Sequence, residues 1–280
     1  MMTRILVAVI CLPLLLFVVL GLPAWATAIL FGLLAVLAVH ELLWTTKLLR
    51  HKRIIAYTMV MAALTVFYSY ASVACPAWAA SLSVGAKAAV FLYFSLLFCE
   101  LLAAHTELKI APVCVAAFGG IVIPWLLSAL VRIRAMESGR YFILIAFILS
   151  MVADSAAYFV GRACGKHKLA PIISPKKTVE GAIGGVVFTI GAMVLYAFLL
   201  KRCFHFTCVN YLSAAVYGLV GSLGSILGDL TFSVIKRQSG VKDYGKLLPG
   251  HGGVLDRFDS TLIVAPLTEL LLLIIPFAAR

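Results

Sequence analysis

Charged residues are scarce in this chain. Only 12% of its 280 residues are charged, whereas 64% are apolar, and a soluble domain of ordinary composition carries roughly 25% charged residues. Apolar runs of about 20 residues recur along the whole length, and each is long enough to cross a bilayer as a helix. The shortage of charge therefore excludes an ordinary soluble domain and predicts an all-α, polytopic membrane protein.

Several common signatures are also missing. The seven cysteines contain no CxxC pair and no metal-ligand spacing, and the sequence has no P-loop, no dinucleotide fingerprint, no tandem repeat and no low-complexity segment. Most cysteines lie in apolar runs, where they behave as small hydrophobic residues. Cys203 and Cys208 share one short loop and could form a disulfide if that loop is extracytoplasmic.

The hydrophobic pattern predicts nine membrane-spanning helices. Their approximate ranges are 4–20, 23–44, 54–74, 85–104, 110–131, 141–160, 181–200, 211–232 and 260–279. The first span has two interpretations. Arg4, an apolar stretch and Ala24-Trp25-Ala26 resemble a signal peptide. The apolar character resumes at once through Trp44, however, which favours a tight helical hairpin around Gly21-Leu22-Pro23.

The distribution of Lys and Arg predicts the orientation of the chain. The net charge is +12, but the cations lie in short loops between spans, which argues against a nucleic-acid partner. If the N-terminus is cytoplasmic, 16 of the 23 Lys and Arg residues fall on the cytoplasmic side, as the positive-inside rule requires. The polar loops after the sixth and eighth spans then share the cytoplasmic face. We therefore expect N-terminal transmembrane helices over 1–140 and a catalytic region over 141–280.

Six of the 11 carboxylates gather in or beside the two polar loops of that second region. They are Asp154, Glu180, Asp229, Asp243, Asp256 and Asp259. Asp229 shares one helical face with Ser233 and Lys236, and Asp256 shares another with Asp259. A carboxylate beside a membrane span is costly unless it is paired or bound to a metal. Pairing with Lys or Arg would explain one such residue, but three around a glycine-rich turn favour a metal site built from Asp229, Asp256 and Asp259.

The glycine-rich turn is Pro249-Gly250-His251-Gly252-Gly253. Glycines let backbone N–H groups approach phosphate oxygens, and the helix that follows adds partial positive charge. A bound Mg²⁺ would bridge the carboxylates to the phosphates. The remaining phosphate charge would be neutralised by nearby cations, namely Lys236, Arg237, Lys242, Lys246 and Arg257. His251 has three open interpretations, as a ligand, a proton donor or a structural hydrogen-bonding residue.

The loop after the sixth span contributes a second polar segment. Asp154, Ala157, Tyr158 and Gly161 have the spacing of one helical face, and the small residues among them are also typical of close helix packing. Ser174-Pro175-Lys176-Lys177-Thr178-Val179-Glu180-Gly181 follows. Ser174 and Thr178 either bind substrate or cap the next helix. Lys176 and Lys177 are either phosphate contacts or positive-inside anchors. Three further glutamates near spans, which we expect only to pair across helices, are Glu41, Glu100 and Glu269.

The segment Ser233–Asp259 resembles the signature of the phosphatidate cytidylyltransferase family, the CDP-diglyceride synthases. It carries S-x-x-K-R, then K-D, then P-G-H-G-G-x-x-D-R-x-D at the family's spacing. The Asp154–Gly161 and Ser174–Gly181 segments are similar to further motifs of that family. The resemblance covers about 150–260, and the five N-terminal spans match only in being apolar.

The resemblance implies an enzyme that joins CTP and phosphatidate to give CDP-diacylglycerol and pyrophosphate with Mg²⁺ and a possible second metal ion. It implies Asp229, Asp256 and Asp259 as metal ligands. The phosphate contacts would be Lys236, Arg237, Lys242, Lys177 and Arg257. Ser174, Thr178 and Ser233 would bind substrate, and the backbone of Gly250, His251, Gly252 and Gly253 would contact the triphosphate. The enzyme would lie in the plasma membrane, with its site facing the cytoplasm, as a possible homodimer.

Three alternatives remain open at this point. A CTP-dependent polyprenol kinase and an archaeal-type cytidylyltransferase would use the same kinds of residues on another lipid. An anion transporter would place its charges near the bilayer midplane in two paired broken helices. This chain has its charges at one predicted surface, which disfavours the transporter.

Overall fold

The computed structural model describes residues 2–204, 206–245, 247, 250 and 252–279, without the side chains of 2–8 and 279. The chain forms two compact units. The first contains Met1–Glu137 and Gln238–Phe258, and the second contains Ser138–Arg237 and Asp259–Arg280. Gln238–Phe258, which contains the glycine-rich turn and Asp256, belongs to the first unit, whereas Asp229 and Asp259 belong to the second. The predicted functional division at residue 140 stays a prediction.

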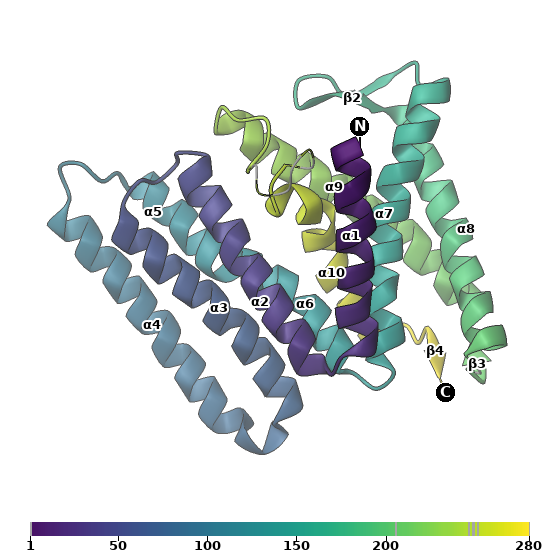
Figure 1. The fold of residues 1–280 in the computed structure, drawn as a ribbon, viewed down its shortest axis with the longest axis horizontal. Helices are drawn as coiled ribbons and strands as arrows, with labels where there is room; N and C mark the ends of the chain where they lie inside the picture. Colours follow the sequence, from purple (N-terminus) through teal and green to yellow (C-terminus); the bar gives the residue numbers. More distant parts are fainter. Residues whose placement is uncertain (1, 205, 246, 248–249, 251, 280) are drawn as a thin grey trace. The chain divides into compact units, whose positions relative to one another are not determined.

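The first unit is a bundle of long apolar helices, with α2, α3, α4 and α6 packed side by side (Figure 1). Its helices are α1 (Met2–Leu16), η1 (Phe17–Gly21), α2 (Ala24–His40), η2 (Glu41–Thr45), α3 (Lys52–Ala74), η3 (Pro76–Trp78), α4 (Ala79–Ala103), α5 (Ile110–Ala117), η4 (Phe118–Val122) and α6 (Ile123–Ala135). Fully buried apolar side chains such as Val39, Leu43, Ile54 and Leu97 form its core.

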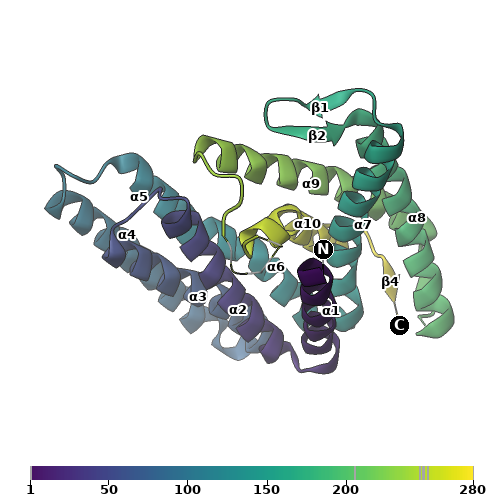
Figure 2. The same ribbon diagram turned by 45° about the horizontal axis from the view of Figure 1, so that its top comes forward.

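The second unit consists of long helices, one small β-hairpin and a pair of short antiparallel strands that are distant in sequence (Figure 2). Its elements are α7 (Gly139–Cys164), β1 (Lys168–Ala170), β2 (Ser174–Thr178), α8 (Val179–Cys203), β3 (Cys208–Val209), α9 (Tyr211–Gln238), α10 (Leu255–Ile274) and β4 (Ala278–Ala279), the ends of α9 and α10 reaching into the first unit. The antiparallel pairs are β1 with β2 and β3 with β4. The sequence did not predict these strands.

Within the described residues, seven helical segments are long and apolar enough to cross a membrane. They correspond to the second to eighth predicted spans and confirm the all-α, polytopic fold. The predicted total of nine stays a prediction. The first predicted span is a short helix with a π-helical turn, and the last differs from its predicted range. Its helix ends at Ile274, because Pro276 cannot continue a helix and Ala278–Ala279 pairs with Cys208–Val209 instead.

The hairpin predicted around Gly21-Leu22-Pro23 is present in the first unit. Leu22 and Pro23 both have extended backbone, so the chain breaks between η1 and α2. The guanidinium of Arg134 donates to the carbonyl oxygens of Val19 and Leu22 at 2.7 and 2.8 Å. Arg134 thereby satisfies carbonyls that the break leaves without helical partners.

The cysteines are all free, including Cys203 and Cys208. The conditional disulfide between those two residues is therefore not formed in this structure. Cys208 instead belongs to β3, where its backbone pairs with Ala279 of β4.

Glycines bring α7 and α8 into close contact in the second unit. A Cβ atom on Gly181 would lie 2.6 Å from the carbonyl oxygen of Ala157, and one on Gly161 would lie 2.7 Å from Oγ1 of Thr178. Such approach is typical of small-residue helix interfaces in membranes. The packing interpretation of Ala157 and Gly161 is therefore the one that the structure supports.

This contact predicts different effects for two glycines of the same helix. Gly181→Ala should destabilise the protein by about 1–3 kcal/mol, because the new methyl group meets a backbone carbonyl that cannot move independently. Gly191→Ala is the matched control, since a Cβ atom there meets nothing within 4 Å. Thermal unfolding in detergent should show a lower Tm for Gly181→Ala alone. Equal Tm values for the two variants would contradict the contact.

Candidate active site

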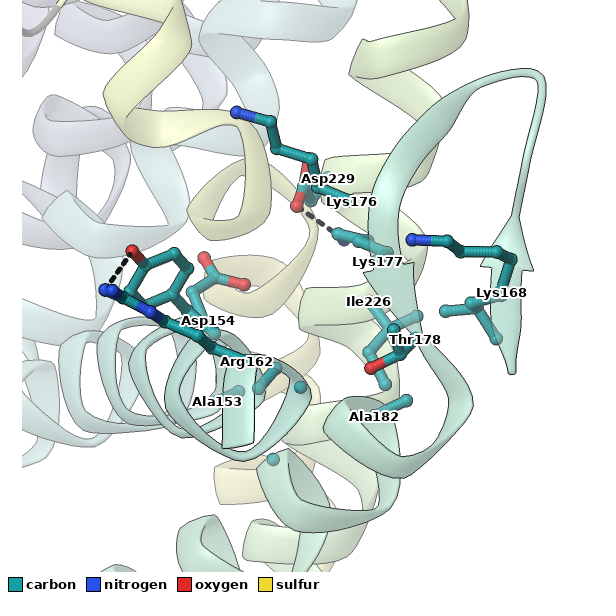
Figure 3. A pocket seen from close by; sticks show the side chains of 15 residues that line it. Ala153, Asp154, Arg162, Lys168, Lys176, Lys177, Thr178, Ala182, Ile226 and Asp229 are labelled. Atoms are coloured by element: carbon teal, nitrogen blue, oxygen red, sulfur yellow. Dashed lines mark hydrogen bonds and ion pairs between the residues drawn. The ribbon is translucent and has the colours of Figure 1, made fainter. Parts of the chain in front are cut away.

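A pocket of about 490 Å³ opens in the second unit among α7, α8, α9 and the β1–β2 hairpin (Figure 3). Small residues of α7 and α8, such as Ala157 and Gly185, supply apolar lining. Asp154 comes from α7 and Asp229 from α9. The cations that line the pocket are Arg162, Lys168, Lys176 and Lys177. Carboxylates and cations thus share a cavity whose remaining walls are largely apolar.

Two ion pairs of the second unit join Asp229 and Asp259 to lysines. Lys177 of β2 contacts Oδ2 of Asp229, and Nζ of Lys236 lies 3.6 Å from Oδ2 of Asp259. All four side chains are largely withdrawn from solvent, with exposed fractions between 12% and 24%. The predicted shared face on α9 is present as well, because Ser233 donates to Oδ1 of Asp229 at 3.1 Å. Asp229, Ser233 and Lys236 therefore lie together as the spacing predicted.

Asp154 connects three helices of the second unit. Its carboxylate accepts a hydrogen bond from Ser225 of α9 at 3.1 Å and another from Ser260 of α10 at 2.7 Å. Gly228 makes this junction possible, because a Cβ atom there would lie 2.9 Å from the carbonyl oxygen of Asp259. Asp154 thus joins α10 at Ser260 to α9 at Ser225. Neither serine was predicted from the sequence.

Asp259 has an unusual electrostatic environment. Burial raises the pKa of its carboxyl, and the nearby Asp229 carboxylate raises it further, to about 6, although Lys236 opposes the shift. A buried carboxylate whose ionisation is opposed by a neighbouring carboxylate belongs to a site that a cation would stabilise. Asp259 and Asp229 are therefore the acidic pair with the strongest physical case for binding a positive ligand.

The β1–β2 hairpin is held over the pocket by contacts at both ends. Arg237 of α9 donates to the carbonyl oxygen of Ile173 at 3.2 Å. At the other end, Glu180 accepts hydrogen bonds from the backbone N–H groups of Lys166 and His167, and it pairs with Nδ1 of His167 at 2.6 Å. These contacts position Lys177 and Lys176 beside α9.

The capping interpretation of Thr178 is confirmed. Thr178 has an extended backbone before α8, and its hydroxyl accepts the N–H of Gly181 at 3.2 Å. Ser174 begins β2 and does not cap α8. The substrate-binding roles predicted for Ser174 and Thr178 stay predictions, and Thr178 is a buried residue that lines the pocket.

The glycine-rich turn belongs to the first unit, where its described residues fold around Asp256. Oδ2 of Asp256 accepts the backbone N–H of Tyr244 at 2.8 Å and that of Gly253 at 2.9 Å. Gly250 and Gly252 have φ values of +78° and +87°, a conformation that favours glycine. Asp256 therefore acts as an acceptor for its own loop. Its predicted role as a metal ligand beside Asp229 and Asp259 stays a prediction.

The other residues predicted around this turn lie in several settings. Lys242 and Asp243 line a cavity of about 610 Å³ with His40 and Glu41. Arg257 is exposed in the first turn of α10. His251, Pro249 and Lys246 lie outside the described residues, so their predicted roles are unchanged.

The donor chemistry of the second unit fits Mg²⁺. Mg²⁺ prefers oxygen ligands and commonly takes one or two carboxylates together with substrate phosphates. Asp229 and Asp259 supply such a pair. Among the side chains that the structure describes, no cluster of three or more His, Cys, Asp or Glu residues is arranged to hold a metal. The remaining ligands of an ion here would come from substrate and water.

These features define a class: a polytopic helical membrane protein with a lysine- and carboxylate-lined pocket suited to an anion. Comparison with known proteins gives the family. The profile of the cytidylyltransferase family matches residues 2–275. The chain therefore belongs to the cytidylyltransferase family, and the predicted membership is confirmed.

Individual relatives match about half of the chain. The phosphatidate cytidylyltransferase of Staphylococcus haemolyticus is 43% identical over 137 residues, which cover 49% of this chain and 51% of that protein. The same enzyme of Staphylococcus aureus strain COL is 45% identical over 137 residues, with the same shares. That of Staphylococcus saprophyticus is 44% identical over 138 residues, again 49% and 51%. The matched segment spans about half the length of these curated relatives.

Proposed function

We propose that this protein is a phosphatidate cytidylyltransferase, which transfers the cytidylyl group of CTP to phosphatidate. The reaction releases pyrophosphate and forms CDP-diacylglycerol for phospholipid synthesis. The names of the relatives support the proposal, and so does the family to which the chain belongs. The observation that carries it is the pairing of Asp229 with Lys177 and of Asp259 with Lys236 in a membrane-embedded unit.

In the proposed reaction, a phosphate oxygen of phosphatidate attacks the α-phosphorus of CTP. The bond from that phosphorus to the bridging oxygen of the β-phosphate breaks, and pyrophosphate leaves with the electron pair. The attacking oxygen is already an anion near neutral pH, so the reaction needs no strong general base. The main barrier is the repulsion between two anions that must be held in line.

Charged side chains in and beside the pocket would offset that repulsion. Lys177 and Lys236 would exchange part of their contact with Asp229 and Asp259 for phosphate oxygens, while Lys176 and Arg237 add positive charge from the hairpin and α9. Mg²⁺, when bound by Asp229 and Asp259, would neutralise charge on the triphosphate and the leaving pyrophosphate. Preorganised charge of this kind is usually the largest contribution to such catalysis.

We further propose that Lys242, Arg257 and the backbone of Gly250–Gly253 bind the CTP phosphates, as the sequence predicts. Ser233 would keep Asp229 oriented through the hydrogen bond that it donates. The location in the plasma membrane, the cytoplasmic orientation of the site and a homodimer are parts of the same proposal. The positive-inside count supports the orientation.

The position of a radioactive label tests the reaction class. Purified protein would be supplied with phosphatidate and CTP labelled at either the α- or the γ-phosphate. Cytidylyl transfer should place the α-label in lipid and leave the γ-label in pyrophosphate. A lipid that carries the γ-label instead would identify a kinase and overturn the proposal. Replacing phosphatidate by a polyprenol or by an archaeal-type ether lipid tests the acceptor in the same assay.

The acidity of Asp259 predicts a pH effect. Its pKa of about 6 means that the carboxyl gains a proton as the pH falls through that value, and a protonated carboxyl is a poor metal ligand. Apparent Mg²⁺ affinity should therefore fall about tenfold for each pH unit below 6. Mg²⁺ titrations at several pH values would measure this slope. The slope should be shallower in Asp259→Asn, and an identical slope in that variant would assign the titration elsewhere.

A further inference from the structure

Glu41 lies at the end of a transmembrane helix of the first unit, far in sequence from the glycine-rich turn. It is only 5% exposed. Its Oε1 accepts the backbone N–H of Val254, and its Oε2 accepts that of Leu255, both at 3.0 Å. Leu255 is the first residue of α10, and the first N–H groups of a helix have no partner inside it. Glu41, the first residue of η2, thus supplies hydrogen-bond acceptors for two backbone N–H groups at the start of α10.

The position of this carboxylate explains why residues 245 and 253 are glycines. A Cβ atom on Gly245 would lie 2.4 Å from Oε1 of Glu41, and one on Gly253 would lie 2.4 Å from Oε2. The carboxylate cannot easily move aside, since both oxygens are engaged and the side chain is buried. Two glycines therefore close around Glu41, and any other residue at either place would displace it.

Asp256 holds the same segment through other atoms. It accepts the N–H groups of Tyr244 and Gly253, whereas Glu41 accepts those of Val254 and Leu255. Asp256, from the segment itself, and Glu41, from the N-terminal helices, thus accept the backbone N–H groups of Tyr244, Gly253, Val254 and Leu255. The backbone at Gly253–Leu255 therefore depends on a residue that lies 213 positions before Val254 in the chain.

We infer that Glu41 is a positioning residue that fixes the backbone of Gly253–Leu255, where the glycine-rich turn enters α10, for binding of the nucleotide triphosphate. This inference rests on the proposed function, because it assumes that this backbone contacts CTP. The N-terminal helices thereby take a specific part in nucleotide binding. The sequence alone indicated no function for Glu41.

Glu41→Gln tests the inference, with Glu100→Gln as its matched control. Glu100 is also a buried glutamate of the first unit, but it pairs with His51 and Arg53 and not with the turn. Glu41→Gln replaces one acceptor oxygen by an amide that faces an N–H donor. Its KM for CTP should rise about tenfold or more, while its KM for phosphatidate changes less than about twofold. Glu100→Gln should leave the ratio of the two KM values unchanged.

Amide hydrogen exchange of the wild-type and variant proteins provides a readout that needs no catalysis. The N–H groups of Val254 and Leu255 should exchange at least about tenfold faster in Glu41→Gln than in wild type, and at the wild-type rate in Glu100→Gln. If Glu41→Gln does not purify as a single species, Glu41→Asp takes its place. That variant keeps both oxygens on a shorter side chain and should shift exchange and KM in the same direction.

If the N–H groups of Val254 and Leu255 exchange at the wild-type rate in Glu41→Gln, the inference is overturned. Equal changes in the KM for CTP and the KM for phosphatidate would also overturn it. A wild-type protein that transfers no label from CTP to lipid would instead overturn the proposed function. In that case faster amide exchange in Glu41→Gln would still show that Glu41 holds the backbone at Val254 and Leu255. Only its proposed role in nucleotide binding would be overturned.

Discussion

Asp229→Asn is expected to reduce cytidylyl transfer by about 10²–10³-fold. The substitution keeps the size of the side chain but removes the charge that pairs with Lys177. It leaves Asp259 as the remaining member of the acidic pair, so both the binding of a divalent ion and the orientation of Lys177 are weakened. Initial rates with saturating CTP and phosphatidate in mixed micelles would measure the loss.

Glu107→Gln is the control for this substitution. It makes the same chemical change at an exposed acid in the turn between α4 and α5, and Glu107 does not line the pocket. Its rate should stay within about twofold of wild type, as is usual for surface substitutions. A rate for Asp229→Asn that matches this control would remove Asp229 from the active site.

Asp256→Ala is expected to abolish most activity and also to destabilise the protein. Two buried N–H groups, those of Tyr244 and Gly253, lose their acceptor, and each unsatisfied donor costs about 1–3 kcal/mol. Thermal unfolding should show a lower Tm both with and without Mg²⁺. A Tm that falls even without Mg²⁺ would show that Asp256 supports its loop through hydrogen bonds, independently of any metal.

A residue that acts only as a metal ligand would behave differently. Removing it would relieve repulsion among carboxylates in the metal-free protein, so the Tm without Mg²⁺ would rise or stay unchanged. That result for Asp256→Ala would contradict the hydrogen bonds seen here and favour the ligand role that the sequence predicts. Asp256→Asn keeps one acceptor oxygen, so its Tm should lie between those of Asp256→Ala and wild type.

The helices were predictable because the bilayer imposes a single requirement on them. A long apolar run must satisfy its backbone internally, and a helix does so without reference to the rest of the chain. The predicted spans 141–160 and 181–200 therefore lie inside α7 and α8. The hairpin Lys168–Thr178 was missed because short polar strands depend on partners beyond their own sequence, here the contacts made by Arg237 and Glu180.

The arrangement of site residues was predictable only where the residues belong to one helix, because their spacing then determines which face they share. Asp229, Ser233 and Lys236 are spaced i, i+4 and i+7 along α9, and the structure places them on one face of that helix. The partners of Asp154 come from two other helices, and those of Asp256 are backbone groups. No local pattern encodes such contacts, so a carboxylate that supports a loop looks the same in sequence as one that binds a metal.

We propose that Asp229 and Asp259, with their lysines, bind both a divalent ion and an anionic substrate. Electron paramagnetic resonance of Mn²⁺, added to purified protein with CTP, would detect the bound ion. Wild-type protein should give a bound-ion signal that weakens about tenfold or more in Asp229→Asn and in Asp259→Asn but persists in Glu107→Gln. Equal Mn²⁺ binding in all four proteins would show that these two aspartates do not hold the ion.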